Sequence, residues 1–171
     1  MTRDVLWAPW RGKYVGGPKP DGCVFCRSIE GSDDRGSLVL LRGSRAFLIL
    51  NRFPYTVGHL MVVPNRHVGA MEDLTGAEAA EVWVLAVRAK RALDAVLRPH
   101  GYNVGLNLGP AAGAGVADHL HLHVVPRWVG DSNFLPVLGE VRVISQHLLE
   151  TYDNLVSELT RQGGEGASGE R

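Results

Sequence analysis

Three histidines alternate with apolar residues in the segment His119-Leu120-His121-Leu122-His123. Because a β-strand points successive side chains to opposite faces, this spacing predicts that the three imidazoles share one face of a sheet. Imidazole titrates near neutral pH, so it can act as a nucleophile or as a general acid or base under physiological conditions. The row indicates a catalytic strand. The alternative is three structural histidines whose ring nitrogens are satisfied by hydrogen bonds.

The residues that lead into this strand are small. Residues 109–117 contain only glycine, alanine, valine and proline. Without bulky side chains, the backbone N–H groups of such a loop can approach an anion closely and cradle it. A phosphate held there would lie over the histidine row, so the two segments together predict chemistry at a phosphorus atom.

The chain has two cysteines, Cys23 and Cys26, and two residues separate them. This spacing lets both thiolates bind one zinc ion. The pair supplies half of a tetrahedral site, so further ligands must come from elsewhere, and the histidine strand offers a candidate. The alternative is a redox-active or simply reduced pair, although no thioredoxin-like βαβ pattern surrounds it.

The composition is that of one globular domain with a substantial core. The chain has 171 residues, of which 45% are hydrophobic and 21% charged, and its net charge is zero. Lysine and arginine do not cluster, which argues against duplex nucleic acid as a partner because such binding depends on phosphate neutralisation. No apolar run could span a bilayer, and the start lacks the apolar core of a signal peptide. A cytoplasmic location without membrane contact is therefore expected.

Local patterns predict an α+β fold, with an antiparallel sheet of about five strands and helices on one side. A strand pattern rich in apolar and β-branched residues recurs along the chain and is bounded by turn residues. The expected strands are residues 37–41, 46–51, 59–64 and 102–108, followed by the histidine segment, while residues 31–37 read as a loop.

Two helices are expected. Thr75 and Glu78 fit a capping box at the start of a long helix that should run to about Arg98. Its apolar band is wide, which suggests that it packs on the sheet and also on a partner. Ser145 could cap a last helix that ends near Arg161.

A single domain is expected over residues 1–162. Its first part, residues 1–22, is an irregular arm whose Trp7 and Trp10 should dock on the body or on a second subunit. The small polar residues 163–171 should form a disordered tail.

Several segments share a pattern with one known family. The histidine row reads His-φ-His-φ-His-φ-φ, where φ is apolar, and residues 51–64 and 107–113 precede it in a matching order. On these motifs the chain resembles the histidine triad (HIT) superfamily of nucleotidyl hydrolases and transferases, over residues 23–128. The resemblance implies one HIT domain, built from a HIT-like sheet with one long and one C-terminal helix.

The resemblance also implies roles for the histidines. His121 would be the nucleophile that attacks the α-phosphorus and forms a nucleotidyl-histidine intermediate, for which its ring must be neutral. His123 would donate a hydrogen bond to a phosphate oxygen or to the leaving group, which makes it the second catalytic residue. The residues implied in nucleotide binding are Asn51, His59, Asn107, Gly113, Gly115, His123 and Trp128.

Some of these residues have simpler structural alternatives. Asn51 matches a position that binds ribose hydroxyls in relatives, but it also suits a turn that closes a strand. Asn107 matches a position that contacts phosphate. His59 stands at the start of a strand, where it could merely pack or support another residue. Trp128 could stack on a base in its own subunit or across a dimer, or it could fill an interface.

Zinc-bearing members of the superfamily use a paired-cysteine motif, a histidine after the third strand and the first histidine of the triad. Here the resemblance implies Cys23, Cys26, His67 and His119 as the ligands of Zn²⁺. Four protein ligands fill a tetrahedron, so the ion would be structural. Zinc-free members also exist, so His119 could instead serve only the histidine row.

Further segments look like one branch of the superfamily. Residues 6–11, 51–64 and 126–134 resemble the branch of diadenosine tetraphosphate phosphorylases and dinucleoside polyphosphate hydrolases. The hydrolases carry Gly-Gln-Ser or Gly-Gln-Thr just before the triad, whereas this chain has Gly113-Ala114-Gly115. The smaller residues leave room for inorganic phosphate, which would give phosphorolysis; alternatively, the backbone of Gly113 and Gly115 could replace the lost donors and water could still resolve the intermediate. The phosphorylase branch also has small residues there, so the resemblance favours phosphorolysis.

The expected activity is cleavage of dinucleoside polyphosphates, by phosphorolysis or by hydrolysis. One alternative is a nucleotidylyltransferase that acts on another acceptor, such as a sugar phosphate. A second is a regulatory module that binds nucleotides without useful catalysis. A homodimer is usual in this superfamily, and the wide apolar band of the helix at residues 75–98 fits one.

Overall fold

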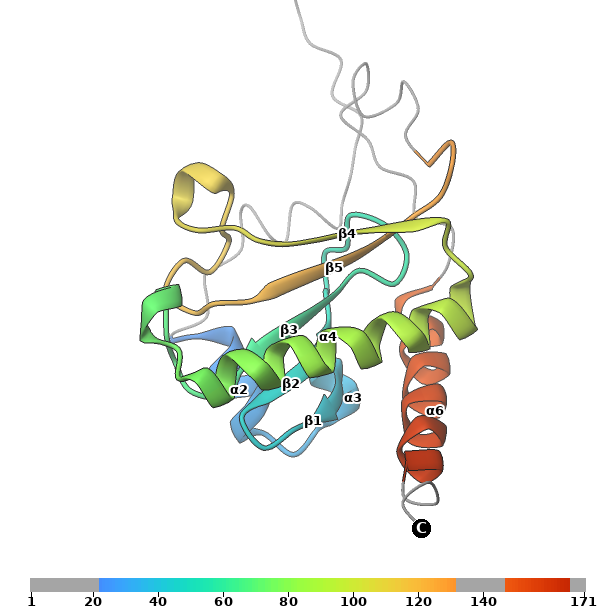
Figure 1. The fold of residues 1–171 in the computed structure, drawn as a ribbon, viewed down its shortest axis with the longest axis horizontal. Coiled ribbons are helices and arrows are strands. Elements are labelled where there is room, and N and C mark those ends of the chain that lie inside the picture. Colours follow the sequence, from blue (N-terminus) through green and yellow to red (C-terminus); the bar gives the residue numbers. More distant parts are fainter. Residues whose placement is uncertain (1–21, 132–146, 167–171) are drawn as a thin grey trace, which may run out of the picture.

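The computed structural model describes residues 22–131 and 147–166. The described residues form short helices, strands and two longer helices (Figure 1). In chain order they are α2 (Val24–Glu30), α3 (Asp34–Ser37), β1 (Val39–Arg42), β2 (Ala46–Leu50), β3 (Leu60–Pro64), η1 (Met71–Asp73), α4 (Gly76–Leu97), β4 (Gly101–Leu106), η2 (Pro110–Ala112), β5 (Leu122–Arg127) and α6 (Leu148–Gly166).

The five strands form one antiparallel sheet in the order β1-β2-β3-β5-β4, which confirms the predicted fold class. The register sets Ile49, Met61, His123 and Gly105 side by side across four strands. Residues directly opposite each other in an antiparallel pair share a face, so this row lines the histidine face of the sheet. Strand β4 is the last in the order and has a single neighbour, β5, among the described strands.

Only one of the three alternating histidines lies inside a strand. β5 begins at Leu122, so His123 belongs to it while His119 and His121 precede it. The backbone of this preceding segment bonds to a residue outside the sheet, because the N–H of Leu120 donates to the carbonyl of Val68 at 2.7 Å. Of the triad segment, only the part from Leu122 onward therefore pairs with β3 and β4.

Helix α4 has the predicted capping box. The Glu78 N–H donates to the Thr75 hydroxyl at 3.2 Å, and the Thr75 N–H donates to the Glu78 carboxylate at 2.8 Å. Hydrogen bonds from the Arg66 guanidinium and from the Thr75 backbone lower the pKa of Glu78 to about 2. The helix ends at Leu97, and its C-cap Arg98 has a left-handed φ of 49° and precedes Pro99. These caps fix the position of α4 along the sheet.

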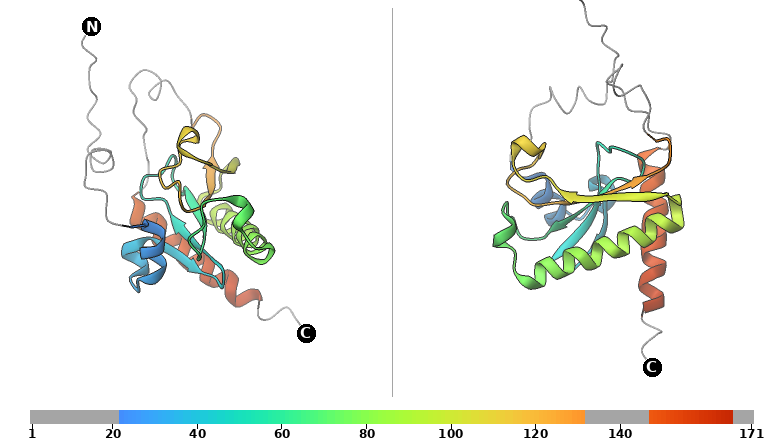
Figure 2. Two further views of the ribbon diagram at one scale, coloured as in Figure 1. Left: turned by 90° about the vertical axis from the view of Figure 1, so that its left-hand side faces the viewer. Right: turned by 45° about the horizontal axis from the view of Figure 1, so that its top comes forward.

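The two long helices pack on the sheet and on each other. α4 runs along β2, β3 and β5, while α6 crosses α4 and contacts β1 (Figures 1 and 2). The Tyr152 hydroxyl of α6 donates to the carbonyl of Val39 at 2.8 Å, which joins the helix to β1. No helix in the described ranges is long and apolar enough to cross a membrane.

Helix α6 reaches Gly166, beyond the expected end near Arg161, so residues 163–166 of the expected tail continue the helix. The arm at residues 1–21, the proposed cap Ser145 and residues 167–171 lie outside the described residues.

The short helices α2 and α3 were not predicted from the sequence. Residues 34–37, expected in a loop, form one helical turn that Asp33 caps by accepting from the Gly36 N–H at 2.8 Å. α2 starts directly after Cys23 and has no side-chain cap, so no capping signal marks it. Elements of one or two turns show too little periodicity to be recognised. α2 matters for the site because Cys23 and Cys26 lie at its start.

Candidate functional site

His121 is held in one orientation by the backbone of the triad itself. Its Nδ1–H donates to the carbonyl oxygen of His119 at 2.8 Å, so in the neutral ring Nε2 keeps its lone pair. Burial lowers the pKa of His121, although the bond to His119 opposes this shift. The ring is therefore neutral near pH 7, with a nucleophilic nitrogen that makes no hydrogen bond to another described residue.

His123 belongs to a chain of hydrogen bonds that starts at a backbone amide. The Tyr55 N–H donates to Nδ1 of His59 at 3.0 Å, so the proton of the neutral His59 ring sits on Nε2. That nitrogen lies 2.9 Å from Nδ1 of His123 and donates to it. The proton of His123 is thereby left on Nε2, the nitrogen that faces away from His59.

Burial is the main cause that lowers the pKa of His123 to about 4, and the charge of nearby His121 adds to it. His123 is therefore a neutral hydrogen-bond donor at physiological pH. The amide of Asn107 lies 3.5 Å from Nε2 of His123, at the end of β4. The structure thus brings His123 and Asn107 together.

His59 is completely buried, with 0% of its surface exposed. It lies behind His123 and contacts it through the bond described above. Asn51 lies beside it, with its amide nitrogen 3.3 Å from Nδ1 of His59. The Asn51 carbonyl accepts from the Phe53 N–H at 2.9 Å, so the side chain also closes the turn after β2.

Four potential metal ligands gather at the start of α2. The sulfur of Cys23 lies 3.3 Å from Nδ1 of His119, and the sulfur of Cys26 lies 3.3 Å from Nδ1 of His67 and 3.7 Å from Nδ1 of His119. All four ligand atoms lie within 4.8 Å of one another. In a tetrahedral zinc site with ordinary bond lengths, neighbouring ligand atoms are about 3.3–3.8 Å apart.

The protonation of this cluster also suits a metal ion. The Nε2–H of His119 donates to the carbonyl of Pro64 at 2.9 Å, which leaves Nδ1 without a proton and directed at the sulfurs. Burial raises the pKa of the Cys26 thiol, and the neighbouring Cys23 raises it further. Two adjacent thiolates need a compensating positive charge, which a divalent ion would supply. The residues therefore fit zinc in number, type and spacing.

The glycine loop before the triad has the backbone conformations that only glycine adopts easily. Gly109 and Gly113 have φ values of 77° and 83°. The N–H groups of Ala112 and Ala114 both donate to the carbonyl of Gly109, at 3.2 and 3.3 Å. Gly113 and Gly115, which follow the η2 turn, are exposed. The yellow η2 turn and the blue α2 lie at the same end of the sheet (Figures 1 and 2).

Trp128 and His121 lie at opposite ends of β5. Trp128 follows the last residue of β5, whereas His121 precedes the first. A strand rises about 3.3 Å per residue, so the two residues stand about 20 Å apart. Trp128 is therefore separated from His121 by the whole length of β5, and the histidine near it is His100, whose Nδ1 accepts from the Val129 N–H at 2.9 Å.

Two aromatic residues at the site were given no firm role by the sequence. The Phe25 ring lies 5.4 Å from the ring of His119 and 5.1 Å from that of His121. The Tyr55 ring lies 4.6 Å from His59 and 6.0 Å from His123. Tyr55 stands in a turn, and nothing in its surroundings in the sequence marks it.

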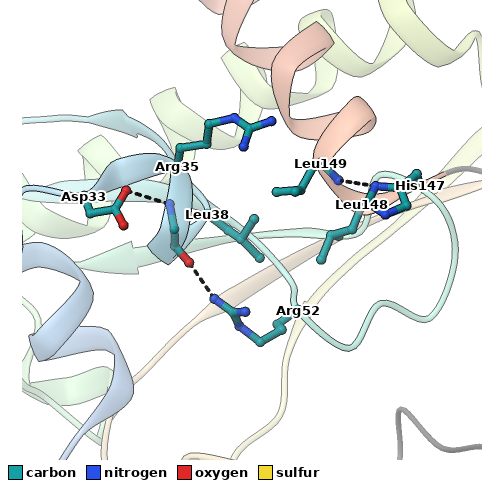
Figure 3. A pocket seen from close by; sticks show the side chains of 8 residues that line it. Asp33, Arg35, Leu38, Arg52, His147, Leu148 and Leu149 are labelled. Atoms are coloured by element: carbon teal, nitrogen blue, oxygen red, sulfur yellow. Dashed lines mark hydrogen bonds between the residues drawn. The ribbon is translucent and has the colours of Figure 1, made fainter.

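An open hollow of about 580 Å³ lies elsewhere, between α3 and the start of α6 (Figure 3). Its polar groups already have protein partners, since Arg52 donates to the Gly36 carbonyl at 2.7 Å and Arg35 pairs with Asp153 at 2.9 Å. None of the predicted site residues lines this hollow. Its lining residues are Asp33, Arg35, Gly36, Leu38, Arg52, His147, Leu148 and Leu149. The histidine cluster remains the stronger candidate site.

Comparison with known proteins gives a consistent result. Residues 34–129 match the HIT domain. The AP-4-A phosphorylase of Mycobacterium tuberculosis is 45% identical over 166 residues, which cover 92% of this chain and 85% of that protein. The adenosine 5'-monophosphoramidase of Schizosaccharomyces pombe is 30% identical, over 61% of this chain and 74% of that protein.

Among solved structures, a zinc-bound histidine triad family protein from Mycobacterium smegmatis superposes with a TM-score of 0.67 at 28% identity. The superposition covers 84% of this chain and 97% of that chain.

Proposed function

The chain belongs to the HIT domain family, and on that premise we propose that it cleaves dinucleoside polyphosphates such as diadenosine tetraphosphate. The observation that carries the proposal is the 2.8 Å bond from His121 Nδ1 to the His119 carbonyl, which leaves Nε2 as a nucleophile. The 45% identity to an AP-4-A phosphorylase supports the substrate class.

In the first half-reaction, Nε2 of His121 attacks the α-phosphorus and the bond to the polyphosphate oxygen breaks. The product is a nucleotidyl group on His121 and a free nucleoside polyphosphate. That leaving group is a stable phosphate anion, so a hydrogen bond suffices to assist its departure. The Nε2–H of His123 supplies that bond, and Asn107 and the loop N–H groups at Gly113 and Gly115 hold the remaining oxygens.

In the second half-reaction, inorganic phosphate attacks the nucleotidyl group and releases His121. Diadenosine tetraphosphate would then yield ATP in the first step and ADP in the second. Phosphate is favoured over water because Ala114 and Gly115 are small and leave room beside the phosphorus. Asn51 would hold the ribose, and His59 acts through His123 without touching the nucleotide.

Incubation with diadenosine tetraphosphate, with and without inorganic phosphate, tests this proposal. Phosphate-dependent formation of ADP and ATP in equal amounts is the expected result. AMP and ATP in the absence of phosphate would show a hydrolase. Transfer of AMP to a sugar phosphate would indicate a nucleotidylyltransferase. No turnover of any nucleotide substrate by well-folded protein would overturn the enzymatic assignment and leave a nucleotide-binding module.

We also propose that Cys23, Cys26, His67 and His119 bind one Zn²⁺ ion, which would supply a structural crosslink. Their spacing supports a closed four-ligand site, which leaves no open position for substrate. Such an ion would join the start of α2 to the segments that flank β3 and β5. A cytoplasmic location would keep both cysteines reduced and able to bind it.

A homodimer is the assembly that we propose. Trp83, Val84 and Val87 stand together on α4 and are 59%, 58% and 48% exposed. Val104 is 46% exposed on β4, the last strand in the sheet order. Large exposed apolar groups and a strand edge favour contact with another chain.

Light scattering should give twice the chain mass, and Trp83→Arg should give monomers. A dimer would also offer Trp128 a site across the interface.

A further inference from the structure

One residue covers the buried histidine pair. Tyr55 is 43% exposed, whereas His59 is 0% and His123 is 8% exposed. The Tyr55 ring centroid lies 4.6 Å from that of His59, and its plane is 30° from the His59 plane. It lies 6.0 Å from the His123 ring at 28°. The partly exposed aromatic ring therefore lies against both buried imidazoles, with its plane inclined by 30° to His59 and by 28° to His123.

The backbone of the same residue acts on the same pair. The Tyr55 N–H donates to Nδ1 of His59 at 3.0 Å, and this bond determines which nitrogen of His59 carries the proton. Because Nε2–H of His59 then donates to Nδ1 of His123 at 2.9 Å, the proton of the His123 ring is left on its Nε2. Tyr55 thus orders the protons with its backbone and shields the ordered pair with its side chain.

We propose that Tyr55 is a positioning residue that keeps water away from the His59–His123 pair and so holds the N–H of His123 toward the substrate. The consequence for catalysis rests on the proposed function. The arrangement itself does not, because it can be measured in the protein without substrate.

Loss of the ring should change the proton chemistry of His123. The titratable groups that face His123 are His59, His121 and Tyr55, and burial is the main cause of its lowered pKa. Water admitted by removal of the ring would stabilise the imidazolium form. The pKa of His123 should then rise from about 4 toward its ordinary value of 6.5. The neutral ring could also exchange its proton between Nδ1 and Nε2.

Nuclear magnetic resonance of ¹⁵N-histidine-labelled full chain tests this directly. Long-range ¹H–¹⁵N spectra report which ring nitrogen carries the proton, and a pH titration gives each pKa. Wild-type protein should show His59 and His123 protonated at Nε2. Tyr55→Phe keeps the ring and should match wild type. Tyr55→Ala keeps the backbone N–H but loses the ring, and it should raise the pKa of His123 by about one unit.

Tyr55→Ser is a second variant without the ring, and it should reproduce the shift if Tyr55→Ala folds poorly. An unchanged His123 pKa and tautomer in both ring-free variants would overturn the proposal. A shift in Tyr55→Phe as large as in Tyr55→Ala would also overturn it, because the hydroxyl would then be responsible.

Steady-state kinetics of the same variants separate the role of Tyr55 from the proposed function. In turnover of diadenosine tetraphosphate, Tyr55→Ala should lower kcat by about tenfold with little change in KM, and Tyr55→Phe should restore the rate. If wild-type protein turns over no dinucleoside polyphosphate, the proposed function fails while the resonance experiment still decides the role of Tyr55. A higher KM with unchanged kcat would instead make Tyr55 a substrate contact and contradict a positioning role.

Discussion

The carbonyl oxygen of His119 accepts a 2.8 Å hydrogen bond from Nδ1 of His121, while the imidazole of His119 faces Cys23 and Cys26. One residue therefore belongs to two sites, with its side chain in the proposed zinc cluster and its backbone on the proposed nucleophile. A change in the cluster should reach His121 through this single residue, without direct contact between the metal and the substrate.

Removal of the metal should impair catalysis for this reason. Cys26→Ser should lower the zinc content from one equivalent to below about a tenth and reduce kcat by about 10–100-fold, the usual effect of disturbing a supporting residue. Plasma mass spectrometry and steady-state kinetics measure the two quantities. His147→Ala, which lies outside the cluster, should keep full zinc and activity. Zinc-free protein with normal activity would show that the ligand cluster does not orient His121.

Substitution of the nucleophile should abolish turnover without loss of the fold. His121→Ala removes Nε2, and the rate should fall by at least about 10³-fold. Intact-mass analysis of wild-type protein quenched without phosphate should detect one covalent nucleotidyl group, and the variant should carry none. The circular dichroism spectrum should be unchanged. A variant that retains more than about a tenth of the rate would require a different nucleophile.

The fold was largely predictable from local patterns. Apolar and β-branched runs bounded by turn residues, together with the alternation in the histidine segment, located all five strands to within a few residues, and the capping box at Thr75 and Glu78 located α4. The cysteine spacing, joined to a family resemblance, predicted the four residues that gather at the start of α2. These features succeed because each depends on neighbours in sequence or on a spacing that a known chemistry requires.

The proton order around His123 could not be predicted in the same way. His59 and His123 are 64 residues apart, and they meet only because β3 pairs with β5. The Tyr55 amide that orders their protons lies in a turn without a regular pattern. The base-stacking role of Trp128 stays a prediction, because the sequence allowed it either in its own subunit or across a dimer. Trp128 follows the end of β5, at the opposite end of that strand from His121.

The folding stability should fall in mild acid because of His123. Its pKa is about 4 in the folded protein and about 6.5 in the unfolded chain, so the unfolded chain binds more protons between these values. The contribution of neutral His123 to the free energy of unfolding is complete above about pH 6.5 and is lost as the pH falls toward 4.

Thermal melts between pH 8 and 4 measure this effect. His123→Gln, which cannot titrate, should lose less melting temperature than wild type across that window. Glu78, whose pKa is lowered to about 2, acts in more acidic solution and equally in both proteins. Parallel curves for the two proteins would contradict a buried neutral His123.

Space beside His123 should be required for substrate. Gly105 on β4 lies directly opposite His123 on β5, and a Cβ atom added there would meet no heavy atom within 4 Å. A side chain at this position would point to the same face as His123. Gly105→Val should therefore fold normally while it fills the space that the nucleotide needs. We expect kcat/KM to fall by about tenfold or more.

Gly101→Val is the matched control for this prediction. Gly101 lies on the same strand and face, is also open at its Cβ position, but stands opposite Arg127 instead of His123. Both variants replace a strand glycine, so both should gain about 0.5–1 kcal/mol in free energy of unfolding. Denaturant titrations measure this gain, and turnover of diadenosine tetraphosphate measures activity. Only Gly105→Val should lose activity, because only its side chain enters the space beside the proposed hydrogen-bond donor. Equal activity in the two variants would mean that the substrate does not approach His123 from the side of β4.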